Sequence, residues 1–129
     1  MEYIALTGIS DKTIRELRDH ILRTLEIRSP HNFFTSLKLD VGDLVYLTTT
    51  CAQDITNGTV GVIGRVISHQ VVTHRIINGT DTFYEERETM MVRIQLQPLR
   101  TARIRKVLSN SIGEVTRVDA EEISFYNAR

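Results

Sequence analysis

The order of hydrophobic and polar residues at the start of the chain predicts a strand followed by a helix. Residues 2–7 alternate with a period close to two and end at Gly8, which is typical of a short strand. Apolar residues then recur at helical spacing over residues 11–24, and Ser10 stands where an N-cap is needed. We therefore expect one amphipathic helix over residues 11–24, followed by a short extended segment that Ser29-Pro30 closes.

From residue 37 onwards the hydrophobic period changes to two, so the rest of the chain is expected to be mostly strand. Strands are predicted over residues 44–50, 60–77, 80–88, 90–97 and 103–108. Asn78-Gly79 predicts a hairpin between two of them, because Asn-Gly readily adopts the positive φ of a tight turn. Asp119 and Glu122 form a capping box, which predicts a short C-terminal helix.

This order of elements indicates the fold class. An early helix, later strands and short turns predict an α+β fold, with a single domain over residues 1–129. The sheet is expected to be mostly antiparallel and closed into a β-barrel. Val, Ile and Thr account for 40 of the 129 residues, and their β-branched side chains suit a pleated sheet.

Charge and targeting signals narrow the classes of function. The 16 basic and 16 acidic residues balance, which argues against a long surface that follows nucleic-acid phosphates but leaves room for a small pocket. No apolar run approaches the roughly 18 residues of a membrane span, and no signal peptide is evident. Cys51 is the single cysteine, so an intramolecular disulfide is excluded. We expect a cytoplasmic protein without a membrane partner.

Two patterns have a simpler explanation than a binding site. Gly58, Gly61 and Gly64 lie among strand residues, so bends or close backbone approach explain them better than a phosphate loop, which needs a following helix. His69 and His74 are five residues apart on a predicted strand, which directs them to opposite faces and argues against a shared metal ion. We expect no metal site and no cofactor.

Two charged clusters are interpreted in the same way. The acidic residues within 85–88 suit a strand edge that discourages pairing between sheets. Four cations within residues 100–106 form the one local basic surplus, for which a solvated strand face is favoured over a nucleic-acid patch.

The most informative stretch is the junction where the helix gives way to a strand. Glu26 and Arg28 are two residues apart and therefore share one strand face. A carboxylate and a guanidinium held side by side can present an acceptor and a donor fork to one polar ligand. The alternative is a structural ion pair that links the helix to the barrel, and the sequence leaves both interpretations open.

This junction resembles the signature Gly-x-Lys-x-x-Glu-x-Arg of ASCH domains, a branch of the PUA-like superfamily. Arg23, Glu26 and Arg28 fall at the lysine, glutamate and arginine, while Ile21 stands where glycine is expected. The segment 41–47 resembles the Gly-Asp turn and strand that follow in PUA-like and EVE-like domains, and 60–66 resembles their next, glycine-punctuated strand. The whole chain also resembles a small archaeal family of single-domain proteins with no assigned function.

The resemblance implies a PUA-like barrel with a cleft beside its first helix, in a superfamily that binds RNA, modified bases or nucleosides. The first hypothesis is therefore a non-enzymatic module that binds RNA or a modified nucleotide through Arg23, Glu26 and Arg28. Weaker candidates for the same cleft are the side chains of Thr48, Arg65 and His74.

Two alternatives belong to other classes of function. A hydrolase branch of the superfamily uses the motif lysine as a base, but the guanidinium of Arg23 stays protonated and is a poor base. An amidohydrolase acting on an acylated nucleoside would then need Glu26 or Glu88 as the base, assisted by Thr24 or Thr48. The other alternative is a structural or assembly protein.

Overall fold

Two helices and six strands make up the part of the chain that the computed structural model describes, namely residues 1–21, 23–79, 84–111 and 114–123. At residues 74–76, 78 and 84–89 it describes the backbone alone. The elements are, in order, β1 (Glu2–Leu6), α1 (Asp11–Arg18), β2 (Arg23–Ile27), α2 (Pro30–Ser36), β3 (Leu44–Leu47), β4 (Val60–Gly79), β5 (Tyr84–Ser109) and β6 (Arg117–Glu122).

The strands form one mixed sheet, in the order β2-β5-β4-β3-β1-β6, and β5 also pairs with β6. β1 runs parallel to β3, with Ile4 opposite Val45 and Leu6 opposite Leu47, whereas the other described pairs are antiparallel. The expected β-barrel is therefore wrong: the described strands form a mixed sheet that does not define a barrel. A parallel pair needs a long crossover, and residues 7–43, with α1, β2 and α2, supply it.

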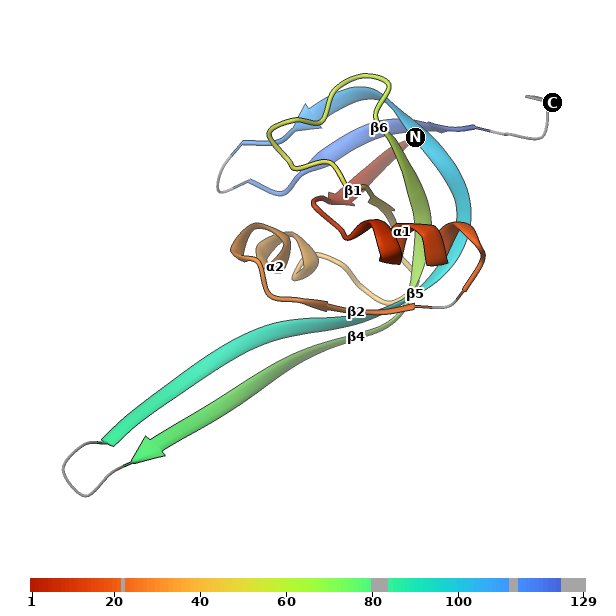
Figure 1. The fold of residues 1–129 in the computed structure, drawn as a ribbon. Coiled ribbons are helices and arrows are strands. Elements are labelled where there is room, and N and C mark those ends of the chain that lie inside the picture. The colour runs from red at the N-terminus through yellow and green to blue at the C-terminus, as the bar shows by residue number, and fades with distance from the viewer. Residues whose placement is uncertain (22, 80–83, 112–113, 124–129) are drawn as a thin grey trace.

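β4 and β5 are much longer than their neighbours and leave the sheet as a two-stranded ribbon (Figure 1). β3 pairs with β4 only at residues 62–65, and β2 pairs with β5 only at residues 92–96. The predicted hairpin is confirmed, but Asn78 and Gly79 are paired strand residues opposite Glu85 and Tyr84, so the predicted position of the tight turn is wrong. Residues 80–83 lie outside the described part.

β5 continues through Pro98, where the sequence predicted a break. Pro98 is paired with Gly64 at an irregularity, since the register shifts between Ile63 and Gly64. Proline has no N–H to donate to a ladder, so a bulge is one of the few places where a strand accepts it. The separate strands predicted over 90–97 and 103–108 are thus parts of one strand.

α1 begins as predicted and ends six residues early. Ser10 is its N-cap and accepts a hydrogen bond from the N–H of Thr13 at 3.2 Å. At the other end His20 has φ 61°, while the N–H groups of His20 and Ile21 donate to the carbonyls of Leu17 and Glu16. This is the bonding pattern of a Schellman stop, which the apolar spacing of residues 21–25 does not reveal.

The second helix and the last strand differ from the predictions. α2 begins where the short extended segment was expected to end, and no element was predicted over residues 31–36; Ser29 is its N-cap, and Pro30 lies in its first turn, a position that suits proline. The C-terminal helix predicted from the capping box of Asp119 and Glu122 is wrong over residues 119–122, which belong to β6. Val118 and Ala120 alternate inward there. Val118 pairs with β1 and with β5, and Ala120 pairs with β5. Residues 124–129 lie outside the described part.

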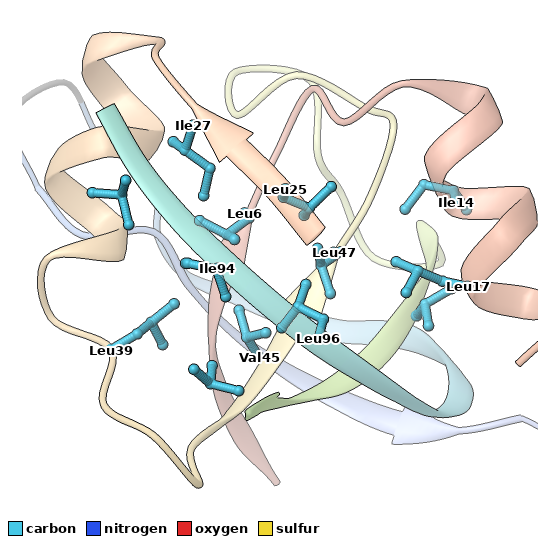
Figure 2. Packing of buried hydrophobic residues seen from close by; sticks show 13 residues of the cluster. Leu6, Ile14, Leu17, Leu25, Ile27, Leu39, Val45, Leu47, Ile94 and Leu96 are labelled. Carbon is cyan, nitrogen blue, oxygen red and sulfur yellow. The ribbon is translucent and has the colours of Figure 1, made fainter. Parts of the chain in front are cut away.

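The buried side chains form two clusters. One packs the two helices against one face of the sheet and includes buried residues of β2, and Figure 2 shows Ile14 and Leu17 of α1 facing Leu47 and Leu96. The other lies on the opposite face around Tyr46, with Ile63, Ile104 and Val118. Because β1, β3 and β4 contribute to both clusters, they are held on both faces.

The second cluster explains one of the glycines. A Cβ at Gly61 would overlap the carbonyl oxygen of Leu47 and lie 2.6 Å from Cζ of Tyr46. Tyr46 is itself buried, and its hydroxyl donates a hydrogen bond to the carbonyl of Thr59 at 2.9 Å. Close backbone approach, predicted for this glycine, is confirmed. No helix in the described part of the chain is long and apolar enough to cross a membrane.

Candidate functional site

The candidate site begins on β2, whose one described neighbour in the sheet is β5. Leu25 and Ile27 are buried, whereas Thr24, Glu26 and Arg28 are exposed, so the strand turns one face to the core and the other to solvent. Glu26 and Arg28 share the solvent face, as their spacing predicted. Nη2 of Arg28 lies 3.3 Å from Oε2 of Glu26, in an ion pair that is exposed on both sides.

Arg23 makes a different contact from the one that its place in the motif suggests. Its Nε lies 2.9 Å from Oε2 of Glu16 on α1, and both atoms are buried. The two atoms form an ion pair without hydrogen-bond geometry. The link from helix to strand that the sequence left open is therefore made by Arg23 with Glu16, and Glu26 and Arg28 pair with each other instead.

All three charged residues of the motif line one hollow of about 510 Å³, called here the polar groove. Its floor and walls come from the loop before α1, from β2 and from the start of α2; the described lining residues are Gly8, Ile9, Ser10, Thr13, Asn32 and residues 23–29. The groove thus offers one carboxylate and two guanidinium groups within a space that suits a nucleotide-sized molecule.

The other three predicted residues lie elsewhere. Thr48 is fully buried, and its hydroxyl donates to the carbonyl of Val60 at 3.2 Å and accepts from the N–H of Thr50. Arg65 is exposed on β4 and is absent from the described lining of the polar groove. The side chain of His74 lies outside the described part, and its backbone pairs with Thr89 on the ribbon. The structure therefore gathers Arg23, Glu26 and Arg28 and leaves Thr48 and Arg65 apart.

A second hollow, of about 520 Å³, adjoins the groove and is called here the apolar cavity. It is built from four segments that are far apart in the chain; the described lining residues are Thr7, Gly8, residues 29–32, Phe34, residues 51–53, Asn110 and Glu114. Gly8, Ser29 and Asn32 line both hollows, so the two meet at the end of β1 and the start of α2. Figure 1 shows α2 beside β1 and β2.

Two hydrogen-bonded side chains hold this junction in place. Asn32 is buried; its Oδ1 accepts from the N–H of Thr7 at 3.1 Å, and its Nδ2 donates to the carbonyl of Thr7 at 2.6 Å. His31 Nε2 lies 2.6 Å from the hydroxyl of Thr116, which is itself fully buried. The start of α2 is thereby tied to β1 and to the segment before β6.

Phe34 is the aromatic side chain of the cavity. It is 66% exposed, while Phe33 beside it packs against the core, and the two rings meet edge to face at 6.3 Å. No pattern in the sequence predicted a site at Phe34, His31 or Asn32. A serine followed by a proline is a common start for a helix. Ser29-Pro30 could therefore have revealed α2 and indicated where its side chains lie.

The basic cluster of residues 100–106 is balanced by acids on β6. Arg103 forms an ion pair of 2.9 Å with Glu121, and Lys106 stands opposite Asp119 in the sheet. The N-terminal ammonium hydrogen-bonds to Asp119 and lowers the pKa of that carboxyl. These contacts fit the solvated strand face that was favoured for the cluster. Among the described residues, no group of three or more His, Cys, Asp or Glu side chains could hold a metal ion.

The family described as "Protein of unknown function (DUF473)" matches residues 1–118, which include every described lining residue of both hollows. The chain belongs to the DUF473 family. It is also 36% identical over 99 residues to Uncharacterized protein MJ0105 of Methanocaldococcus jannaschii, across 77% of this chain. That alignment spans 62% of the relative's length, and no solved structure matches the chain.

Proposed function

We propose that this DUF473 protein is a non-enzymatic binding module for RNA or a modified nucleotide, with the polar groove as its binding site. The observation that carries the proposal is the meeting of Glu26, Arg28 and Arg23 in one hollow. A guanidinium suits a phosphate, and a carboxylate accepts hydrogen bonds from a base edge or a ribose hydroxyl. The resemblance of residues 21–28 to the ASCH signature supports the same ligand class by analogy.

The charged side chains of the groove can exchange their ion-pair partner for a ligand. The pair of Glu26 and Arg28 is 46% and 71% exposed, and exposed ion pairs contribute only about 0–1 kcal/mol. A phosphate can therefore displace the carboxylate from Arg28 at little cost. Arg23 is less available because it already contacts Glu16. We assign phosphate binding to Arg28 and a supporting role to Arg23.

The amidohydrolase alternative is less well supported. Thr48 lies outside both described hollows, and its hydroxyl is engaged with the backbone of residues 50 and 60. Arg23 is always protonated and cannot act as the base. Glu26 is already engaged in an ion pair, with its Oε2 3.3 Å from Nη2 of Arg28.

The proposal is tested by NMR titration of the labelled protein with adenosine 5′-monophosphate and with short RNAs. Resonances of residues 23–28 are expected to shift, and Arg28→Ala is expected to weaken binding. Arg65→Ala is the matched control, since Arg65 is an exposed arginine outside the polar groove, and it should leave the affinity unchanged. Absence of shifts at residues 23–28 with every ligand would refute the proposal.

A further inference from the structure

The apolar cavity next to the groove has the composition of a site for a ring. Much of its lining is apolar, with Pro30, Phe34 and Ala52 among the residues that form it. Its described lining contains one acid, Glu114, and no arginine or lysine. A phosphate would meet the carboxylate of Glu114 there and no arginine or lysine, so the cavity favours an uncharged, flat group over an anion.

Phe34 is the side chain most suited to receive such a group. A phenylalanine that is 66% exposed gains little from folding, and its neighbour Phe33 already provides the contact of α2 with the core. Exposed aromatic rings are the platforms on which proteins stack the bases of single-stranded nucleic acid. The edge-to-face contact with Phe33 supports one side of the Phe34 ring.

The junction between the two hollows is open. Gly8 lines both of them, and a Cβ at Gly8 would meet no atom within 4 Å. Its φ of 63° explains why glycine stands there, because other residues rarely adopt that conformation. A chain can therefore pass over Gly8 from the groove into the cavity. Each hollow has the volume of a site for one small ligand.

We propose that the two hollows together bind two consecutive nucleotides of single-stranded RNA. The base of one nucleotide enters the apolar cavity and stacks on Phe34, while the phosphate and the neighbouring nucleotide occupy the polar groove at Arg28 and Glu26. This inference rests on the proposed function, and it goes further in making the ligand an RNA strand in place of a free nucleotide.

Isothermal titration with adenosine 5′-monophosphate and with the dinucleotide pApA tests the inference. Stacking of one base on an aromatic side chain is worth about 1–3 kcal/mol, so pApA should bind the unmodified protein roughly 5- to 150-fold more tightly than the mononucleotide. Phe34→Ala should abolish this advantage, whereas Phe34→Tyr, which keeps the ring, should retain it. Arg28→Ala should weaken the binding of both ligands.

The failures of the two proposals are distinguishable. Equal affinity for both ligands, or an unchanged advantage of pApA in Phe34→Ala, overturns the two-nucleotide inference, while the groove remains a nucleotide site if binding still depends on Arg28. Loss of the Arg28 dependence overturns the proposed function itself.

A second measurement needs no variant. Cys51 is exposed, lines the apolar cavity and is the single cysteine of the chain, so a maleimide labels one site. Saturating pApA should slow this labelling at least several-fold, and saturating adenosine 5′-monophosphate should slow it less. Equal labelling rates with pApA and without ligand would contradict entry of a base into the cavity.

Discussion

Replacing Gly61 with alanine tests whether β3 and β4 are held together by close backbone contact. The added Cβ would overlap the carbonyl oxygen of Leu47 and lie 2.6–2.7 Å from Cζ and the hydroxyl oxygen of Tyr46. The obstructing carbonyl belongs to a strand that is buried on both faces, so it has little freedom to move. The ring of Tyr46 is also fully buried.

The expected cost follows from these contacts. Overpacking of a well-packed core typically costs about 1–3 kcal/mol. Displacing Tyr46 would also break its hydrogen bond to the carbonyl of Thr59, and leaving buried partners unpaired costs about 1–3 kcal/mol more. The reduced freedom of the unfolded chain returns about 0.4–1 kcal/mol. We therefore expect Gly61→Ala to lower the free energy of unfolding by about 1–6 kcal/mol.

Gly64 supplies the matched control. It is buried on the same strand, but unlike Gly61 it has room for a methyl group. The nearest atoms to its Cβ would lie at 3.4 and 3.7 Å, which are ordinary contacts. Urea denaturation followed by circular dichroism should show Gly64→Ala within about 1 kcal/mol of the unmodified protein. If Gly61→Ala were as stable as Gly64→Ala, the close approach of β3 and β4 would be refuted.

Three further predictions concern single contacts. Burial raises the pKa of the Tyr46 phenol, so above pH 10 the unfolded chain loses this proton first and stability falls by about 1.4 kcal/mol per pH unit; Tyr46→Phe should remove this part of the pH dependence in urea titrations at pH 9 and 11. Asn32→Ala leaves the N–H and carbonyl of Thr7 unpaired and should cost about 2–4 kcal/mol in thermal or urea unfolding, and a cost below 1 kcal/mol would contradict the anchoring role. A double-mutant cycle of Glu16→Gln with Arg23→Ala should give a coupling energy of at most about 1 kcal/mol, because both side chains are partly exposed although the contacting atoms are buried, and a larger coupling energy would contradict this expectation.

Local patterns in the sequence were enough to predict several elements. The alternation of residues 2–7, the serine before α1 and the hairpin near Asn78-Gly79 all correspond to features of the structure. The shared face of Glu26 and Arg28 was equally predictable, since side chains two apart on a strand point the same way. These features depend on neighbours within a few residues, so a short stretch of sequence is enough to predict each of them.

The errors arose where a local pattern had two outcomes. Apolar residues at 21–25 fit a helix or a buried strand, and pairing with β5 decides for β2. Asp119 and Glu122 have the spacing of a capping box, but Val118 and Ala120 are buried between two strands, and that burial decides for β6. In both cases contacts with distant segments outweighed the local preference.

By itself, the sequence determined a chain of mostly strand, the start of α1, and a carboxylate and guanidinium on one face of β2. The tertiary structure decided that β1 pairs in parallel with β3, that Arg23 contacts Glu16, and that an apolar cavity adjoins the charged groove. The physical reason is the separation along the chain over which each interaction acts. Strand period and helix capping act between near neighbours, whereas strand order, ion pairs between elements and cavities exist only when residues as distant as Gly8 and Asn110 are brought together.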